Sequence, residues 1–289
     1  METAALFSLL AVEPGQALAL LSVGFFSGLA SRFVGSDGAL LLPALLMSMG
    51  IPGLTAISST MAQRVPKLLI GAAHRGRLGQ VNEGLGVRLA LWAAAGVLGG
   101  VAFQHFVQTQ VGVAASNLCL SVAMIVVMVW LGGRAMRHVM GHTSPVPQEP
   151  ATDRHPPSLS SPRFSAVQLA RIGLSNGLAT AAVAVGGVVA VPAMVRWLNI
   201  PVLVASGTDL LVSAWSSLIG VLVLYALGHL HLGITLLLLL GSLLGIQLSA
   251  VSRTHLPPRT VRLVLGLAMG IILISQLFVL PGYLDHLNY

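Results

Sequence analysis

Residues 202–227 read VLVASGTDLLVSAWSSLIGVLVLYAL, an apolar run whose one charged residue is Asp209. About 20 predominantly apolar residues are enough for an α-helix to cross the hydrocarbon core of a bilayer. A helix also bonds its own backbone N–H and C=O groups, which lipid cannot do. This stretch therefore predicts a transmembrane helix.

The rest of the chain has the same character. Of its 289 residues, 55% are hydrophobic and 8% are charged, and the mean hydropathy is +0.89. Soluble domains carry about 25% charged residues, so the composition excludes an ordinary water-soluble enzyme and a separate soluble catalytic domain. We expect about eight to ten membrane crossings. The other apolar runs are 17–34, 39–49, 54–73, 85–106, 111–131, 172–185, 188–198, 232–251 and 261–280.

Residues 140–162 interrupt this pattern. They contain six prolines among serines and charged residues, and such a composition cannot bury an apolar core. We therefore divide the chain into a first transmembrane repeat at 17–139, a Pro-rich cytoplasmic linker at 140–165 and a second transmembrane repeat at 166–281.

The two halves match when the chain is shifted so that Gly24 falls on Gly173. Matched glycines and prolines are informative because they mark specific backbone conformations and close approaches. The sequence thus predicts an internal duplication. Further matched pairs are Gly28 and Gly177, Gly38 and Gly187, Pro43 and Pro192, Pro52 and Pro201, Gly71 and Gly220, Gly79 and Gly228, and Gly96 and Gly245.

The arginines orient the two halves in opposite directions. They cluster after the third run of the first half, after the fourth run of the second half and around the linker, whereas the matching regions 225–235 and 102–113 have none. Because cytoplasmic loops are enriched in Arg and Lys, the linker faces the cytoplasm and both chain ends face outward. This predicts an all-α polytopic protein of the inner (plasma) membrane, with two inverted-topology repeats of about four to five transmembrane segments each.

Two glycine-containing breaks interrupt apolar runs at residues 35–38 (GSDG) and 185–187 (VGG). Breaks of this kind survive in a membrane only inside the protein or beside a water-filled cavity. Helices that begin at Gly38 and Gly187 would present free N–H groups and the positive end of the helix dipole, which suits an anion. The alternative is a tight helix crossing that needs small residues.

The third run carries a polar stripe at helical spacing. Thr60, Arg64 and Lys67 share one face with Gly71 and His74, and the matching positions in the second half are Asp209, Ser213, Ser216 and Gly220. Ionisable residues inside a membrane are costly, so they are candidates for function. We expect Arg64, Lys67, Thr60, Gly38, Gly187, Ser213 and Ser216 to bind the substrate. The alternative is that Arg64 and Lys67 extend toward the interface near His74.

Asp37 and Asp209 are the only acidic residues inside the apolar segments. Either can carry a proton, with Asp209 the preferred carrier, or either can form a neutralising ion pair with Arg64. The sequence contains no nucleophile elbow, P-loop, HExxH or CxxC, so neither an enzyme nor a cofactor or metal is expected.

The stretches Gly24-Phe25-Phe26-Ser27-Gly28-Leu29, Leu42-Pro43-Ala44-Leu45 and Gly71-Ala72-Ala73-His74-Arg75-Gly76-Arg77-Leu78 resemble the TauE/SafE-type sulfite exporter family. The second copy, residues 173–192 and 205–220, resembles that family's duplicated half. The resemblance implies a multi-pass inner-membrane protein that moves small sulfur-containing anions. Where the family has a Gly-rich triplet, this chain has Ser36-Asp37-Gly38-Ala39, and a carboxylate there disfavours a dianion unless it is protonated or paired.

These observations predict a secondary transporter for a small anion such as sulfite, a sulfonate or a carboxylate, driven by an ion or proton gradient. Expected partners are the anionic substrate and membrane lipid, with a homo-oligomer left open and no nucleic acid. The alternative function is a membrane-embedded assembly protein without transport, whose polar stripes would face a partner helix. The short second segment of each half either spans the membrane or re-enters it.

Overall fold

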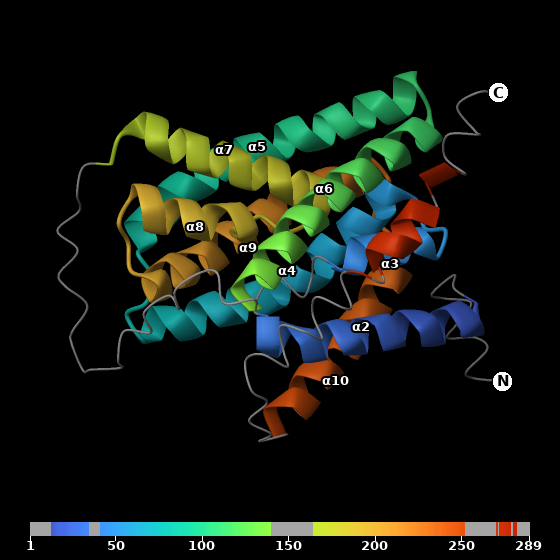
Figure 1. The fold of residues 1–289 in the computed structure, drawn as a ribbon, viewed down its shortest axis with the longest axis horizontal. Coiled ribbons are helices and arrows are strands. Elements are labelled where there is room, and N and C mark those ends of the chain that lie inside the picture. Colours follow the sequence, from blue (N-terminus) through green and yellow to red (C-terminus); the bar gives the residue numbers. More distant parts are fainter. Residues whose placement is uncertain are drawn as a thin grey trace.

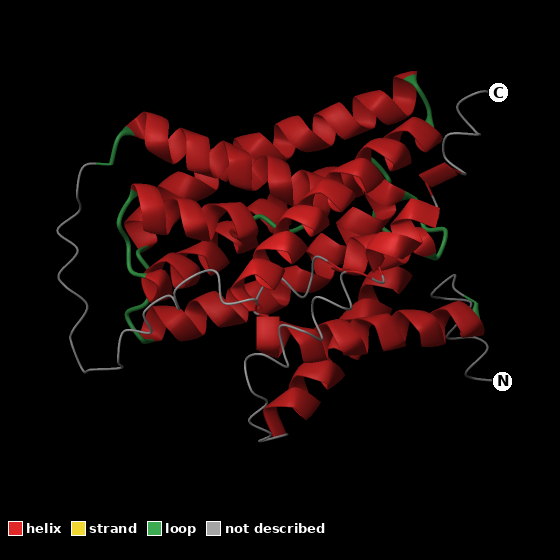
Figure 2. Cartoon of the chain, in the orientation of Figure 1, coloured by secondary structure: helices red, strands yellow, loops and turns green. Residues whose placement is uncertain are grey.

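The computed structural model describes residues 13–34, 41–139, 164–251, 270, 272–278 and 280–281. Helices and short loops account for this part of the chain, in which no strand occurs (Figure 2). The predicted all-α fold is therefore confirmed. The helices are α2 (Pro14–Val34), α3 (Leu41–Ser48), α4 (Gly53–Arg77), α5 (Glu83–Gln110), α6 (Val113–Val139), α7 (Ala166–Val183), α8 (Gly187–Trp197), α9 (Val202–Ala226) and α10 (Leu232–Val251).

Several of these helices suit a bilayer. Within the described residues, α5, the Val113–Trp130 part of α6, and α9 are long and apolar enough to cross a membrane. Large apolar side chains also face outward, including Phe26 and Leu91, which are 66% and 69% exposed. By contrast α8 is about 16 Å long at 1.5 Å per residue, too short to cross the roughly 30 Å hydrocarbon core alone.

The closest helix packing joins one helix from each half of the chain. In Figure 1, α2 crosses α10, and α5 lies beside α7. A Cβ on Gly28 would lie 2.9 Å from the backbone carbon of Ser242, and a Cβ on Gly177 would lie 2.7 Å from the backbone nitrogen of Val97. These helices can approach so closely because glycine has no side chain.

The contacts of the matched glycines are reciprocal. Gly24 of α2 packs against the backbone of Leu238 in α10, and Gly173 of α7 packs against the backbone of Leu89 in α5. The sequence shift that places Gly24 on Gly173 also places Leu89 on Leu238. Each half therefore uses the same surface to contact the other.

The matched helices α4 and α9 also begin and end alike. Pro52 precedes α4 with φ −55° and ψ 141°, and Pro201 precedes α9 with φ −53° and ψ 139°. Leu78 follows α4 with φ −86°, and Leu227 follows α9 with φ −82°. The local sequence thus specifies nearly the same backbone at both ends of α4 and α9.

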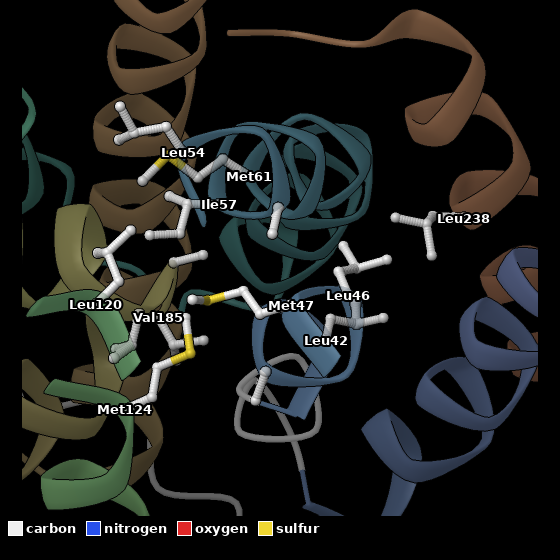
Figure 3. Packing of buried hydrophobic residues seen from close by; sticks show 14 of the residues in the cluster. Leu42, Leu46, Met47, Leu54, Ile57, Met61, Leu120, Met124, Val185 and Leu238 are labelled. Carbon is white, nitrogen blue, oxygen red and sulfur yellow. The ribbon is translucent and has the colours of Figure 1, made fainter. Parts of the chain in front are cut away.

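A hydrophobic core forms around α3 and α4. Met47 of α3 points toward Ile57 of α4, whereas Leu42 and Leu46 of α3 lie on the side of Leu238 (Figure 3). These side chains and that of Met61 are at most 1% exposed. The same cluster includes Leu120 and Met124 of α6, Val185 and Leu238. This core connects α3, α6 and α10 to the helix that carries Arg64.

The glycine contacts provide a test of the fold. We expect Gly177→Ala to lower the melting temperature of the detergent-purified protein, because the new methyl group would overlap the backbone of α5, and overpacking costs about 1–3 kcal/mol. Gly99→Ala is the matched control, since nothing lies within 4 Å of its Cβ and alanine favours a helix by about 1 kcal/mol. Equal melting temperatures for the two variants would contradict this packing.

Candidate functional site

The break between α7 and α8 forms the centre of the candidate site. Helix α7 ends at Val183, and Ala184 has a left-handed φ of 59°, a conformation that costs a non-glycine residue about 1–2 kcal/mol. The Ala184 N–H still donates to the Thr180 carbonyl at 2.8 Å, and α8 begins at Gly187. The predicted break at 185–187 is therefore present. Because the helix ends here, the Ala184 carbonyl oxygen is available to a donor from another helix.

Arg64 reaches this break from α4. Its side chain is 3% exposed, and its Nη1 donates a hydrogen bond to the Ala184 carbonyl oxygen. A guanidinium stays charged even when buried, because its pKa lies far above neutrality. The structure thus places a permanent positive charge inside the protein, at the break between the end of α7 and the start of α8.

Asp209 of α9 contacts Gly187, the first residue of α8. The side chain is 2% exposed, and its carboxylate packs so closely on Gly187 that a Cβ there would overlap Oδ2 and would lie 3.0 Å from Cγ. The Ser213 hydroxyl lies 3.4 Å from the Asp209 Oδ1. The structure therefore brings three predicted site residues together, and the positive end of the α8 dipole favours the negative charge of Asp209.

Two residues of α7 that the sequence analysis did not select complete this region. Asn176 is fully buried, and neither atom of its side-chain amide has a hydrogen-bond partner among the described residues. A Cβ on Gly186 would overlap the Asn176 Oδ1 and would lie 2.5 Å from the Thr180 Oγ1. Polar residues four apart in an apolar helix were the available signal, because they share one face.

Lys67 lies in a different polar cluster. Its Nζ donates to the Gln63 Oε1 at 2.5 Å and to the Ser242 Oγ at 3.3 Å. Ser242 also contacts Gln63, at 3.3 Å between Oγ and Oε1. Lys67 therefore faces α10, whereas Arg64 faces the break between α7 and α8. The sequence spacing put both on one stripe and did not distinguish these neighbours.

The predicted hydroxyl ligands Thr60 and Ser216 bond within their own helices. The Thr60 Oγ1 donates to the Ala56 carbonyl at 2.7 Å, and the Ser216 Oγ donates to the Ser213 carbonyl at 3.2 Å. Both side chains are fully buried. Their protons are thus occupied, and their oxygens can act only as acceptors. Asp37 and Gly38 lie outside the described residues.

A histidine pair lies at the loop between α9 and α10. The rings of His229 and His105 are 5.7 Å apart between centroids, and the Ser58 hydroxyl donates to the His229 carbonyl at 2.7 Å. Burial, and secondarily the nearby His105, lowers the pKa of His229 below its usual value, which favours the neutral ring. No group of three or more metal-ligating side chains occurs within the described residues.

The comparisons with known proteins give one match. A family model described as sulfite exporter TauE/SafE matches residues 20–275, which include every described site residue named above. No curated protein and no solved structure matches the chain.

Proposed function

The chain belongs to the sulfite exporter TauE/SafE family of membrane transporters, and from this premise we propose that it moves a small monovalent or divalent oxyanion through the Arg64 site. Sulfite, organosulfonates and carboxylates are the cargo classes that share the required chemistry, since each presents oxygen atoms with negative charge. The observation that carries the proposal is the buried Arg64 guanidinium at the start of α8.

The site offers three kinds of group to an oxyanion. Arg64 supplies a permanent charge with several N–H donors, the first turn of α8 supplies backbone N–H groups, and Asn176 supplies an amide without a partner among the described residues. Placing a charged residue in a membrane costs about 2.5–3.5 kcal/mol on insertion scales. Arg64 offsets part of this cost through its bond to Ala184, and a bound anion would offset more of it.

The duplicated architecture supports an inverted-repeat transporter. Reciprocal glycine contacts and equal helix ends relate the two halves, and the arginine distribution orients them oppositely. Transporters of this plan bind cargo at discontinuous helices near the repeat interface, which is where α7, α8, α4 and α9 meet. We propose a multi-pass protein of the inner membrane, surrounded by lipid and open to homo-oligomer formation.

Energy would come from an ion gradient, because the sequence has no ATP-binding motif. Asp209 is the proposed proton carrier among the described residues. Its carboxylate packs directly on Gly187 at the break before α8, so movement of α8 relative to α9 would change the surroundings of this carboxylate.

The alternative is a membrane-embedded assembly protein. It predicts polar side chains on an outer face, where a partner helix would cover them. Arg64, Asp209 and Asn176 are instead at most 3% exposed within this single chain. Their burial favours transport over assembly.

Replacing Arg64 tests the site directly. We expect Arg64→Gln to abolish anion flux in proteoliposomes while the protein still inserts, because glutamine removes the charge but keeps a polar side chain. Arg88→Gln is the control, since Arg88 is an exposed arginine on α5. Wild-type flux in Arg64→Gln would exclude this residue from cargo binding.

Cysteine labelling tests the proposed topology. On a Cys119→Ala background, we expect an impermeant thiol reagent to label Thr3→Cys in intact cells and Ser158→Cys only after permeabilisation. The expectation follows from the arginines around the linker. Labelling of Ser158→Cys in intact cells would contradict the inverted topology.

Replacing Asp209 tests proton coupling. Asparagine mimics the protonated acid, so we expect Asp209→Asn to lose accumulation driven by a pH gradient and to retain counterflow exchange. Transport of radiolabelled anion in proteoliposomes measures both. Accumulation that survives in Asp209→Asn would remove this residue from coupling and would direct attention to Asp37.

A further inference from the structure

We propose that the ionised Asp209 carboxylate occupies the position of the transported anion, so that a monovalent oxyanion binds only when Asp209 takes up a proton. Proton and anion would then cross the membrane together. This inference rests on the proposed function and adds to it the charge of the cargo and the sign of the coupling.

The Asp209 carboxylate lies at the N-terminal end of α8. Asp209 packs on Gly187, the first residue of α8, and leaves no room there for even a methyl group. The first N–H groups of a helix have no partner within the helix, and its dipole attracts negative charge. The carboxylate therefore lies where an external oxyanion would bind best.

The buried side-chain amide of Asn176 is an independent sign of a ligand. Asn176 is fully buried beside Gly186, and within the described residues neither its amide nitrogen nor its amide oxygen has a partner. A buried amide without partners costs stability, which a bound ligand would offset. Thr180 cannot supply the missing partner with its own proton, because its hydroxyl donates to the Asn176 backbone carbonyl at 2.8 Å.

An ionised Asp209 carboxylate would repel an anion bound beside it. Two negative charges about 4 Å apart at an effective dielectric constant of about 20 disfavour joint binding by about a thousandfold. Protonation of Asp209 removes this repulsion. It also turns the carboxylate into a hydrogen-bond donor that can bind the incoming anion.

The net charge of Arg64, Asp209 and a bound anion also favours a monovalent anion with one proton. When the site is empty, Arg64 and the Asp209 carboxylate sum to zero. With a protonated Asp209 and a monovalent anion, the sum is again zero. A divalent anion would leave a buried net negative charge, which is costly in a low-dielectric region. The site therefore suits hydrogensulfite, a sulfonate or a monocarboxylate together with one proton.

Few other charges can interfere with this titration. From α4, Arg64 bonds to the Ala184 carbonyl, and Lys67 bonds to Gln63 and Ser242. Arg75 of α4 donates to the Ser206 hydroxyl, three residues before Asp209 in α9. The packed faces of α7 and α8 present Asn176, Thr180 and glycine backbone. The remaining described charges of α5, α7 and α8 are exposed on other parts of these helices, and they are Glu83, Arg88, Arg171 and Arg196.

The test is the pH dependence of binding, measured by titration calorimetry on the full-length protein in detergent. Methanesulfonate is the probe, because it stays monovalent over the pH range used. Above the pKa of Asp209, we expect wild-type affinity to rise about tenfold for each unit that the pH falls, with uptake of about one proton per anion. Repeating the titration in buffers of different ionisation enthalpy measures this uptake.

The variants assign the proton to Asp209. Asp209→Asn should bind methanesulfonate with the same affinity at every pH and without proton uptake, whereas Glu83→Gln, which removes an exposed carboxylate, should behave as the wild type. If Asp209→Asn does not fold, Asp209→Ser serves the same purpose, because serine resembles the neighbouring residues of α9. The wild-type proton uptake needs no variant.

The outcomes separate this inference from the proposed function. Wild-type binding that is independent of pH, or loss of binding in a folded Asp209→Asn, would overturn the inference while anion binding itself remains. Absence of both binding and flux for methanesulfonate, sulfite and acetate in every variant would overturn the proposed function and the inference with it.

Discussion

The hydrogen bond from Arg64 to the Ala184 carbonyl is the interaction on which the site depends. A guanidinium inside a membrane needs an acceptor from the protein, and a carbonyl released by a helix break needs a donor. Arg64 and the left-handed Ala184 satisfy each other's requirement. The break can therefore persist inside the protein, and α8 can begin there at Gly187.

That bond forms only because the two halves of the chain interlock. Each close helix pair, α2 with α10 and α5 with α7, takes one member from each half, and glycines bring their backbones together. In consequence α4 of the first half lies against α9 of the second. The site then combines Arg64 from one half with Asp209 and Asn176 from the other, so neither half could form it alone.

Helices α4 and α9 have similar backbone ends but carry different side chains. The helix ends before and after α4 and α9 have nearly equal dihedral angles. Yet the sequence shift places Arg64 on Ser213 and Asp209 on Thr60. Opposite charges thus occupy different halves of the chain, and each lies against the break region, Arg64 at Ala184 and Asp209 at Gly187.

The sequence by itself determined the helices and their matching ends. Apolar length predicts membrane-spanning helices, and Pro52 and Pro201 predict where α4 and α9 begin, because these are properties of local chain chemistry. It also selected Arg64 and Asp209, since buried charges are rare in apolar runs. Helical spacing gives the face of a helix but not the neighbour that covers it. Only the tertiary structure directed Lys67 to Ser242 of α10, and only it placed Asn176 beside Gly186, because contacts between distant segments depend on how whole helices pack.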